Sequence, residues 1–206
     1  MTNLFLSLYP EKNKERQVEL LTCLQNNAKV FDQIFILTER DEEIKFIPEI
    51  KSKANIFRLP VTVRPTFRTF FQCINKVTGP DDCNVISNSD IYVEEITRMP
   101  QHNEVWALCR YEVDAKGNKT FLNRKDSTDT WLFRGNIRIP RFCDFHQGFG
   151  GCDNRINYEL KEIGYHISNP SITIKSFHLH TGEKSYTPQS PKINRPYHFL
   201  PPIELI

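Results

Sequence analysis

The sequence lacks a large excess of charge, a paired-cysteine motif and a long apolar run. Its formal net charge is only +2 and its basic residues are spread along the chain, so we expect no nucleic-acid surface. The six cysteines include no Cys-x-x-Cys pair, and most stand in apolar runs, where a reduced thiol acts as a small hydrophobic side chain. No apolar stretch has the length of a membrane span, so none is expected.

Two further features are missing from the sequence: a leader and a linker. The opening residues "MTNLFLSLYP" have no basic region before their short apolar stretch, which is unlike a secretory leader. With reduced cysteines, this favours a cytoplasmic protein. No internal repeat or linker divides the 206 residues, so we expect one domain over residues 1–206 and leave the oligomeric state open.

The first half of the chain alternates strand and helix patterns. Apolar, β-branched runs predict strands, and apolar residues at helical spacing predict helices between them. The expected strands cover 4–9, 33–40, 55–60 and 83–87, and the expected helices lie within 11–28 and 64–82. This alternation predicts an α/β fold with a central mixed, mostly parallel sheet and helices on both faces.

The second half is less regular. Residues 104–113 read as one strand, and the following "DAKGNKT" as a hairpin turn that leads to another strand, after which "TDTWLFRG" covers 128–135. A clear amphipathic helix is expected over 153–165. The parallel part of the sheet is therefore assigned to residues 1–95.

The stretch "NVISNSDIYVEE", residues 84–95, ends an apolar strand in the polar triplet Asn88-Ser89-Asp90. In an open parallel sheet, ligands bind beyond the carboxyl ends of the strands. A carboxylate at that position suits a hard divalent cation that also grips phosphate oxygens. The alternative is an aspartate that bonds its own backbone in a turn.

The segment "SNSDIYV" resembles the metal-binding acidic triplet of nucleotide-sugar glycosyltransferases with the GT-A fold. Here Asn88 stands in place of the first acid, which leaves Asp90 as the main metal carboxylate. The resemblance implies a GT-A-like domain, with a nucleotide-binding half over 1–95 and an acceptor half with a C-terminal loop over 96–206. It also implies that Asn88, Ser89 and Asp90 contact the nucleotide sugar.

The segment "GFGGCDNRINYELKEIGYHISNPS", residues 148–171, resembles the Gly-Gly-Glu-Asp segment of the same enzymes. Cys152 replaces the glutamate, so Asp153 is the remaining carboxylate and our first catalytic candidate. A base is needed to take the proton of the acceptor hydroxyl. The alternative is that Asp153 only caps the following helix.

Two histidines near the end of the chain, His178 and His180, alternate along the expected strand "IKSFHLH" and should share a face. In the resembled enzymes a histidine near the chain end completes the metal shell, which implies that Asp90 binds Mn²⁺ (or Mg²⁺) with His178 or His180. An aspartate and histidine shell suits Mn²⁺ chemically. Two histidines on an exposed sheet surface are the alternative.

The segment "RPTFRTFF" places Arg64 and Arg68 four residues apart at an expected helix start, where guanidinium groups and the helix N-terminus would make an anion site. Ordinary solvated arginines are the alternative. Four further residues are candidates for nucleotide-sugar binding. Ser7 and Tyr9 are expected near the base, and Lys184 and Tyr186 in a C-terminal loop that closes over the diphosphate.

The segment "DSTDTWLFRG" places Asp129 two residues before Trp131. An aromatic plane beside a carboxylate suits a saccharide, so we expect both residues to bind the acceptor, with Asp129 as second catalytic candidate. A tryptophan in an alternating strand is more often a core residue.

At closer range the chain resembles a small glycosyltransferase domain encoded by chlorella viruses, mainly in "NSDIY", "DTW" and "CDNR…NPS". This implies a metal-dependent, hexosyltransferase-like enzyme that moves a sugar from a UDP-sugar to a glycan or glycoconjugate acceptor, in the host-cell cytoplasm if the protein is viral. Because Asn88 and Cys152 replace two acids, the alternative is a non-catalytic module that binds a nucleotide sugar or carbohydrate.

Overall fold

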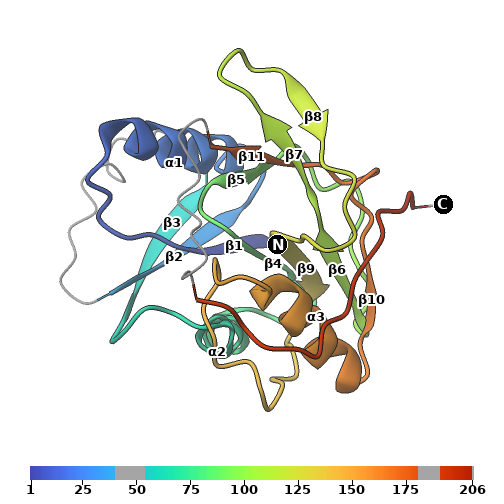
Figure 1. The fold of residues 1–206 in the computed structure, drawn as a ribbon. Helices are drawn as coiled ribbons and strands as arrows, with labels where there is room; N and C mark the ends of the chain where they lie inside the picture. The colour runs from blue at the N-terminus through green and yellow to red at the C-terminus, as the bar shows by residue number, and fades with distance from the viewer. Residues whose placement is uncertain (40–53, 181–190, 206) are drawn as a thin grey trace.

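The computed structural model describes residues 1–39, 54–180 and 191–205 (Figure 1). Within them, a seven-stranded sheet forms the centre of the molecule, in the order β10-β6-β9-β4-β1-β2-β3. Its strands are β1 (Thr2–Ser7), β2 (Gln33–Glu39), β3 (Asn55–Val61), β4 (Cys83–Ser87), β6 (Glu104–Leu108), β9 (Thr130–Arg134) and β10 (His166–Ser168).

The pairing of these strands confirms the predicted mixed, mostly parallel sheet. Strands β4, β1, β2 and β3 run parallel to one another, and so do β10 and β6. Strand β9 is antiparallel to both of its neighbours, β4 and β6. Because β9 runs the other way, its first residues lie at the edge where the parallel strands end.

Helices cover both faces of the sheet, as predicted. Helix α1 (Lys14–Asn27) lies on one face, and α2 (Phe67–Val77) and α3 (Cys152–Glu162) lie on the other (Figure 1). Strand β1 shows the consequence: Leu4 and Leu6 pack in the cluster that holds Leu20 of α1, while Phe5 packs with Phe71 of α2. Alternate side chains point to opposite faces, so a strand covered on both sides reads as a continuous apolar run.

A second, four-stranded sheet has the order β5-β11-β7-β8. It is made by β5 (Ile91–Val93), β7 (Arg110–Val113), β8 (Lys119–Phe121) and β11 (Ser176–Leu179). The single strand predicted over 104–113 is therefore wrong, because the chain changes sheets at Cys109. Its backbone N–H donates to the side chain of Asn169 and its carbonyl accepts from that of Ser176. These side chains replace the strand ladder at that residue.

All six cysteines are free thiols, and five of them are buried, as expected of small apolar side chains. Among the described residues, no helix has both the length and the apolar character that a membrane span requires.

Candidate functional site

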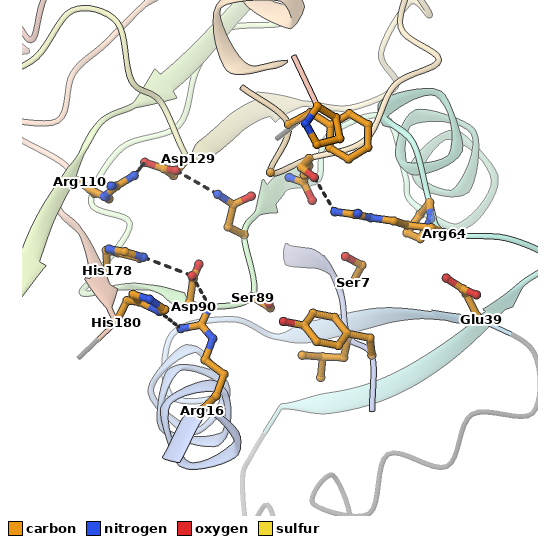
Figure 2. A pocket seen from close by; sticks show the side chains of 18 of the residues that line it. Ser7, Arg16, Glu39, Arg64, Ser89, Asp90, Arg110, Asp129, His178 and His180 are labelled. Carbon is orange, nitrogen blue, oxygen red and sulfur yellow. Dashed lines mark hydrogen bonds and ion pairs between the residues drawn. The ribbon is translucent and has the colours of Figure 1, made fainter. Parts of the chain in front are cut away.

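A cavity of about 790 Å³ opens where the parallel strands of the central sheet end (Figure 2). Ser7 at the end of β1, Glu39 at the end of β2 and the Asn88-Ser89-Asp90 turn after β4 all line it. Asp129, just before the antiparallel β9, lies in the same wall, and its backbone carbonyl accepts from the N–H of Asn88 at 3.1 Å. The topology thus brings together the polar residues at the carboxyl edge.

Asp90 lies at the meeting point of a helix and the second sheet. Its Oδ2 accepts from Arg16 Nη2 of α1 at 2.5 Å and contacts His178 Nε2 of β11 at 3.2 Å. His178 and Glu112 of β7 are opposite one another in the register of the parallel pair β11–β7, and their Nδ1 and Oε2 atoms lie 2.6 Å apart. His178 is therefore held between two carboxylates.

The same network continues to Asp129. Arg110 Nη2 lies 2.9 Å from Glu112 Oε1, and its Nη1 donates to Asp129 Oδ2 at 2.6 Å. The other oxygen of Asp129 accepts from the amide of Asn88 at 3.0 Å. Both oxygens of this carboxylate are thus fixed in place at the cavity wall.

The shifts in pKa follow from these contacts. Burial opposes the charged form of Asp90, but His178 and Arg16 together hold the pKa of Asp90 well below its usual range. Burial likewise disfavours a charged imidazole, yet the hydrogen bond and charge of Asp90, aided by Glu112, raise the pKa of His178. The pKa of Glu112 is lowered by His178 and Arg110, against the effect of burial. The contacts of this network therefore favour the charged forms of Asp90, His178 and Glu112.

Asp90, His178 and His180 each offer one ligand atom within 4.8 Å of the others. The two imidazole rings stack with centroids 5.7 Å apart, which confirms that they share a face. One carboxylate and two imidazoles are a donor set that suits Mn²⁺ better than Mg²⁺, which prefers oxygen ligands. The donors fit a shared divalent ion, although the Arg16 guanidinium also lies among them.

The opposite side of the cavity is formed around Arg64 (Figure 2). Its guanidinium donates to the carbonyl oxygen of Gln147 at 2.8 Å and lies 5.3 Å from the ring centre of Phe149. The side chain of Gln147 is buried and its Nε2 has no hydrogen-bond partner. This amide and the Arg64 guanidinium leave donors available to an acceptor group of a ligand. Ser7 and Tyr9, which the sequence analysis assigned to the nucleotide base, line the same cavity.

The structure separates the two arginines that were predicted to form one anion site. Thr66 is the N-cap of α2, so Arg64 precedes the helix and only Arg68 lies in its first turn. Arg68 donates to the carbonyl oxygens of Pro140 and Arg141, at 3.3 and 2.7 Å, and is not in the cavity wall that the described residues form. Arg68 therefore does not form one site with Arg64, because its Nη2 holds the loop at 140–141 against α2.

Trp131 lies in the core, which overturns its predicted role as a sugar platform. Only 2% of its surface is exposed, its Nε1 donates to Asn157 Oδ1 at 2.8 Å, and its ring meets Phe67 edge-to-face. Asp129 precedes β9 and lies at the cavity wall, whereas Trp131 lies within the strand, on the face that α2 and α3 cover.

Asp153 lies in the first turn of α3, after Gly151, which adopts φ +78° as the N-cap. The carboxylate accepts from the backbone N–H of Thr128 and from the amide of Asn154, both at 3.1 Å. It therefore binds the segment before β9 and is not in the cavity wall, whereas Asp129 is. Burial, with the nearby charge of Asp129, raises the pKa of Asp153 to about 6. The predicted Lys184 and Tyr186 lie outside the described residues.

The sequence analysis missed several residues of the site, among them Arg16, Arg110, Glu112 and Gln147. Arg110 and Glu112 carried a usable signal, since they alternate along a strand as His178 and His180 do. Arg16 carried none, because a single arginine in a helix is ordinarily solvated.

Neither a scan of protein-family models nor a search of curated proteins found a match to this chain.

Replacing Trp131 by phenylalanine should lower the free energy of unfolding without weakening any binding of UDP in the cavity. The variant loses the bond to Asn157 and leaves a buried acceptor unpaired, at a cost of about 1–3 kcal/mol, with a further loss from the smaller ring. Urea unfolding and titration with UDP measure the two effects. The exposed Phe142 provides the control, since Phe142→Leu should change stability by less than about 0.5 kcal/mol. If a stable Trp131→Phe protein bound UDP more weakly than the wild type, the assignment of Trp131 to the core alone would be contradicted.

Replacing Asp153 by asparagine should increase stability at neutral pH. A folded pKa of about 6, above the ordinary aspartate pKa of 3.8, means that folding favours the protonated acid. Its contribution is fully present below pH 3.8 and is lost as the pH rises through 6, on the order of 3 kcal/mol in total. The stability gap between Asp153→Asn and the wild type should therefore widen from pH 5 to pH 7.5 in urea unfolding experiments.

The exposed Asp114 serves as the control for this measurement. Its pKa is lowered by hydrogen bonds from Asn118, so Asp114→Asn should show no widening gap above pH 5. A gap for Asp153→Asn that does not change with pH would contradict the assignment of the raised pKa to burial.

Proposed function

We propose that this protein is a metal-dependent glycosyltransferase that moves a sugar from a UDP-sugar to a saccharide acceptor. The observation that carries the proposal is the Asp90, His178 and His180 cluster, which lies on the wall of a cavity at the carboxyl ends of parallel strands. That is the position at which open α/β sheets bind ligands. The resemblance of the triplet and of the Gly-Gly-Cys-Asp segment to GT-A enzymes points to the same activity.

The size and charge of the cavity support a nucleotide-sugar ligand. A volume of about 790 Å³ lies within the range of ordinary ligand cavities. Of the residues that the structure describes, four arginines line the wall: Arg16, Arg64, Arg110 and Arg124. Guanidinium groups bind phosphate oxygens through paired, charge-assisted hydrogen bonds, so these side chains suit a diphosphate.

Asp90, with His178 or His180, would hold Mn²⁺ (or Mg²⁺) beside the diphosphate. When bound, such an ion neutralises the charge that grows on the departing nucleoside diphosphate. Asn88 and Ser89 would orient the donor at the same strand end, while Ser7 and Tyr9 would contact the base. Arg64 and Gln147 would bind acceptor atoms of the ligand from the opposite wall.

Asp129 is the carboxylate best placed to act on the sugar acceptor. It lines the cavity, and Arg110 and Asn88 fix its two oxygens. In this proposal Asp129 takes the proton of the acceptor hydroxyl as the glycosidic bond forms. Asp153, our first candidate from the sequence, would hold the Thr128 backbone and so position Asp129.

The alternative is a module that binds a nucleotide sugar or carbohydrate without turning it over. The loss of the first acid of the triplet, at Asn88, favours this reading. UDP release from a panel of UDP-sugars in the presence of Mn²⁺ decides between the two, since the enzyme releases UDP and the module binds the donor without releasing it.

Asp90→Asn should abolish the Mn²⁺-dependent part of UDP binding, because the amide is a far weaker metal ligand than a carboxylate. Calorimetric titration with UDP, with and without Mn²⁺, measures this. Some stability will be lost as well, since Asp90 pairs with Arg16 and His178. Asp81→Asn at an exposed acid should leave both properties unchanged. Undiminished metal-dependent binding in the folded Asp90→Asn protein would remove the metal from the proposal.

Asp129→Asn should retain UDP-sugar affinity while transfer falls by a factor on the order of 10²–10⁴, the range for loss of a general base. Asp153→Asn should reduce transfer by less, because its carboxylate acts on the Thr128 backbone and not on the substrate. Initial rates for the two variants at saturating donor give the comparison. A larger loss in Asp153→Asn than in Asp129→Asn would reverse the two roles.

A further inference from the structure

Arg16 is placed by the start of helix α1. Asn13 is the N-cap, and its side chain accepts from the backbone N–H groups of Glu15 and Arg16. This fixes Arg16 in the first turn, where its long side chain extends toward the end of β11 and the turn after β4. The side chain is 18% exposed, so the guanidinium is largely withdrawn from water.

The guanidinium contacts two of the three potential metal ligands. Its Nη2 donates to Asp90 Oδ2 at 2.5 Å, and its Nη1 lies 2.7 Å from His180 Nδ1. The same Nη1 donates to Glu19 Oε2 at 2.7 Å and to the carbonyl oxygen of Leu179 at 3.4 Å. Figure 2 shows Arg16 reaching from α1 to Asp90 and His180. A cationic group thus takes lone pairs that a divalent ion would need.

We propose that Arg16 is an internal competitor of the divalent cation. The cation can take Asp90 and His180 as ligands only after the guanidinium has released them. This inference rests on the metal site of the proposed function and adds a residue that controls how tightly the site binds metal. It requires no change in the fold, since only one side chain of the first turn of α1 has to move.

The released guanidinium has a second partner within reach. Arg16 lines the same cavity as Arg64, where the diphosphate of the donor is expected. A ligand that binds the freed form of Arg16 shifts the equilibrium toward that form and so raises metal affinity. By linkage, the cation raises diphosphate affinity by the same factor. Arg16 would therefore couple the two bound species, and metal alone would bind weakly.

Mn²⁺ binding to the full chain without nucleotide tests the inference directly, by electron paramagnetic resonance of free Mn²⁺. Arg16→Gln should bind Mn²⁺ roughly tenfold to a hundredfold more tightly than the wild type, the range for removal of a charge-assisted hydrogen bond. Arg124→Gln is the matched control. It removes an equal charge from the cavity wall, but Arg124 pairs with Asp126 and not with the cluster. Its Mn²⁺ affinity should change by less than about threefold.

Equal Mn²⁺ affinity in the wild type and Arg16→Gln would overturn the competition and leave the metal site intact. The absence of Mn²⁺ binding in both proteins would overturn the metal site as well, so the two failures are distinguishable. An equal increase of Mn²⁺ affinity in Arg16→Gln and Arg124→Gln would show that the loss of any one positive charge from the cavity wall has this effect. That result would also overturn the inference.

Thermal unfolding checks that Arg16→Gln folds, since the change also removes one partner of Glu19. If it does not fold, Arg16→Lys provides the test. A lysine keeps the charge but presents a single nitrogen in place of the planar guanidinium fork, so it holds Asp90 and His180 less firmly. Its Mn²⁺ affinity should exceed that of the wild type by several-fold, and an unchanged affinity would contradict the proposal.

Discussion

A line of alternating charges runs through the site and joins α1, the turn after β4, the second sheet and the residue before β9. It begins at Glu19 and Arg16 on α1, passes through Asp90 and His178, and ends at Asp129. Glu112 and Arg110 of β7 connect His178 to Asp129. Because removing one member leaves a buried charge without its partner, the positions of helix, sheets and turn depend on one another. The cavity wall is therefore set by electrostatics as much as by packing.

This line of charges also limits what the site can bind. Each carboxylate already has a cationic partner, so a divalent ion gains full use of Asp90 only by displacing Arg16. The arginines in turn must exchange a carboxylate for a phosphate when a diphosphate enters. Binding at such a site is an exchange of ion pairs, whose net free energy is far smaller than the strength of any one contact.

The two sides of the cavity differ in character. One holds the charged network, whereas the other has Arg64 against Phe149 and the unpaired amide of Gln147. A donor without a partner is uncommon in a buried position, and here it lies at the wall of a cavity. A ligand with charge at one end and hydroxyl or carbonyl acceptors at the other would satisfy both sides.

The sequence by itself determined the order of helices and strands in the first half of the chain, the parallel part of the sheet that they form and the shared face of His178 and His180. These follow from local periodicity: an apolar run between helical patterns predicts a strand covered on both faces, and residues two apart in a strand point the same way. It also placed Asn88, Ser89 and Asp90 at a strand end, where the structure has them at the cavity wall.

Only the tertiary structure decided which side chains meet there. Trp131 and Asp129 are two residues apart, but Trp131 is buried under α2 and α3, whereas Asp129 lines the cavity. The change of sheets at Cys109 turns Arg110 and Glu112 toward His178, although the run 104–113 reads as one strand. Arg16 reaches Asp90 across 74 residues of sequence. Ion pairs of that separation depend on how helices and sheets pack, and local periodicity carries no information about that packing.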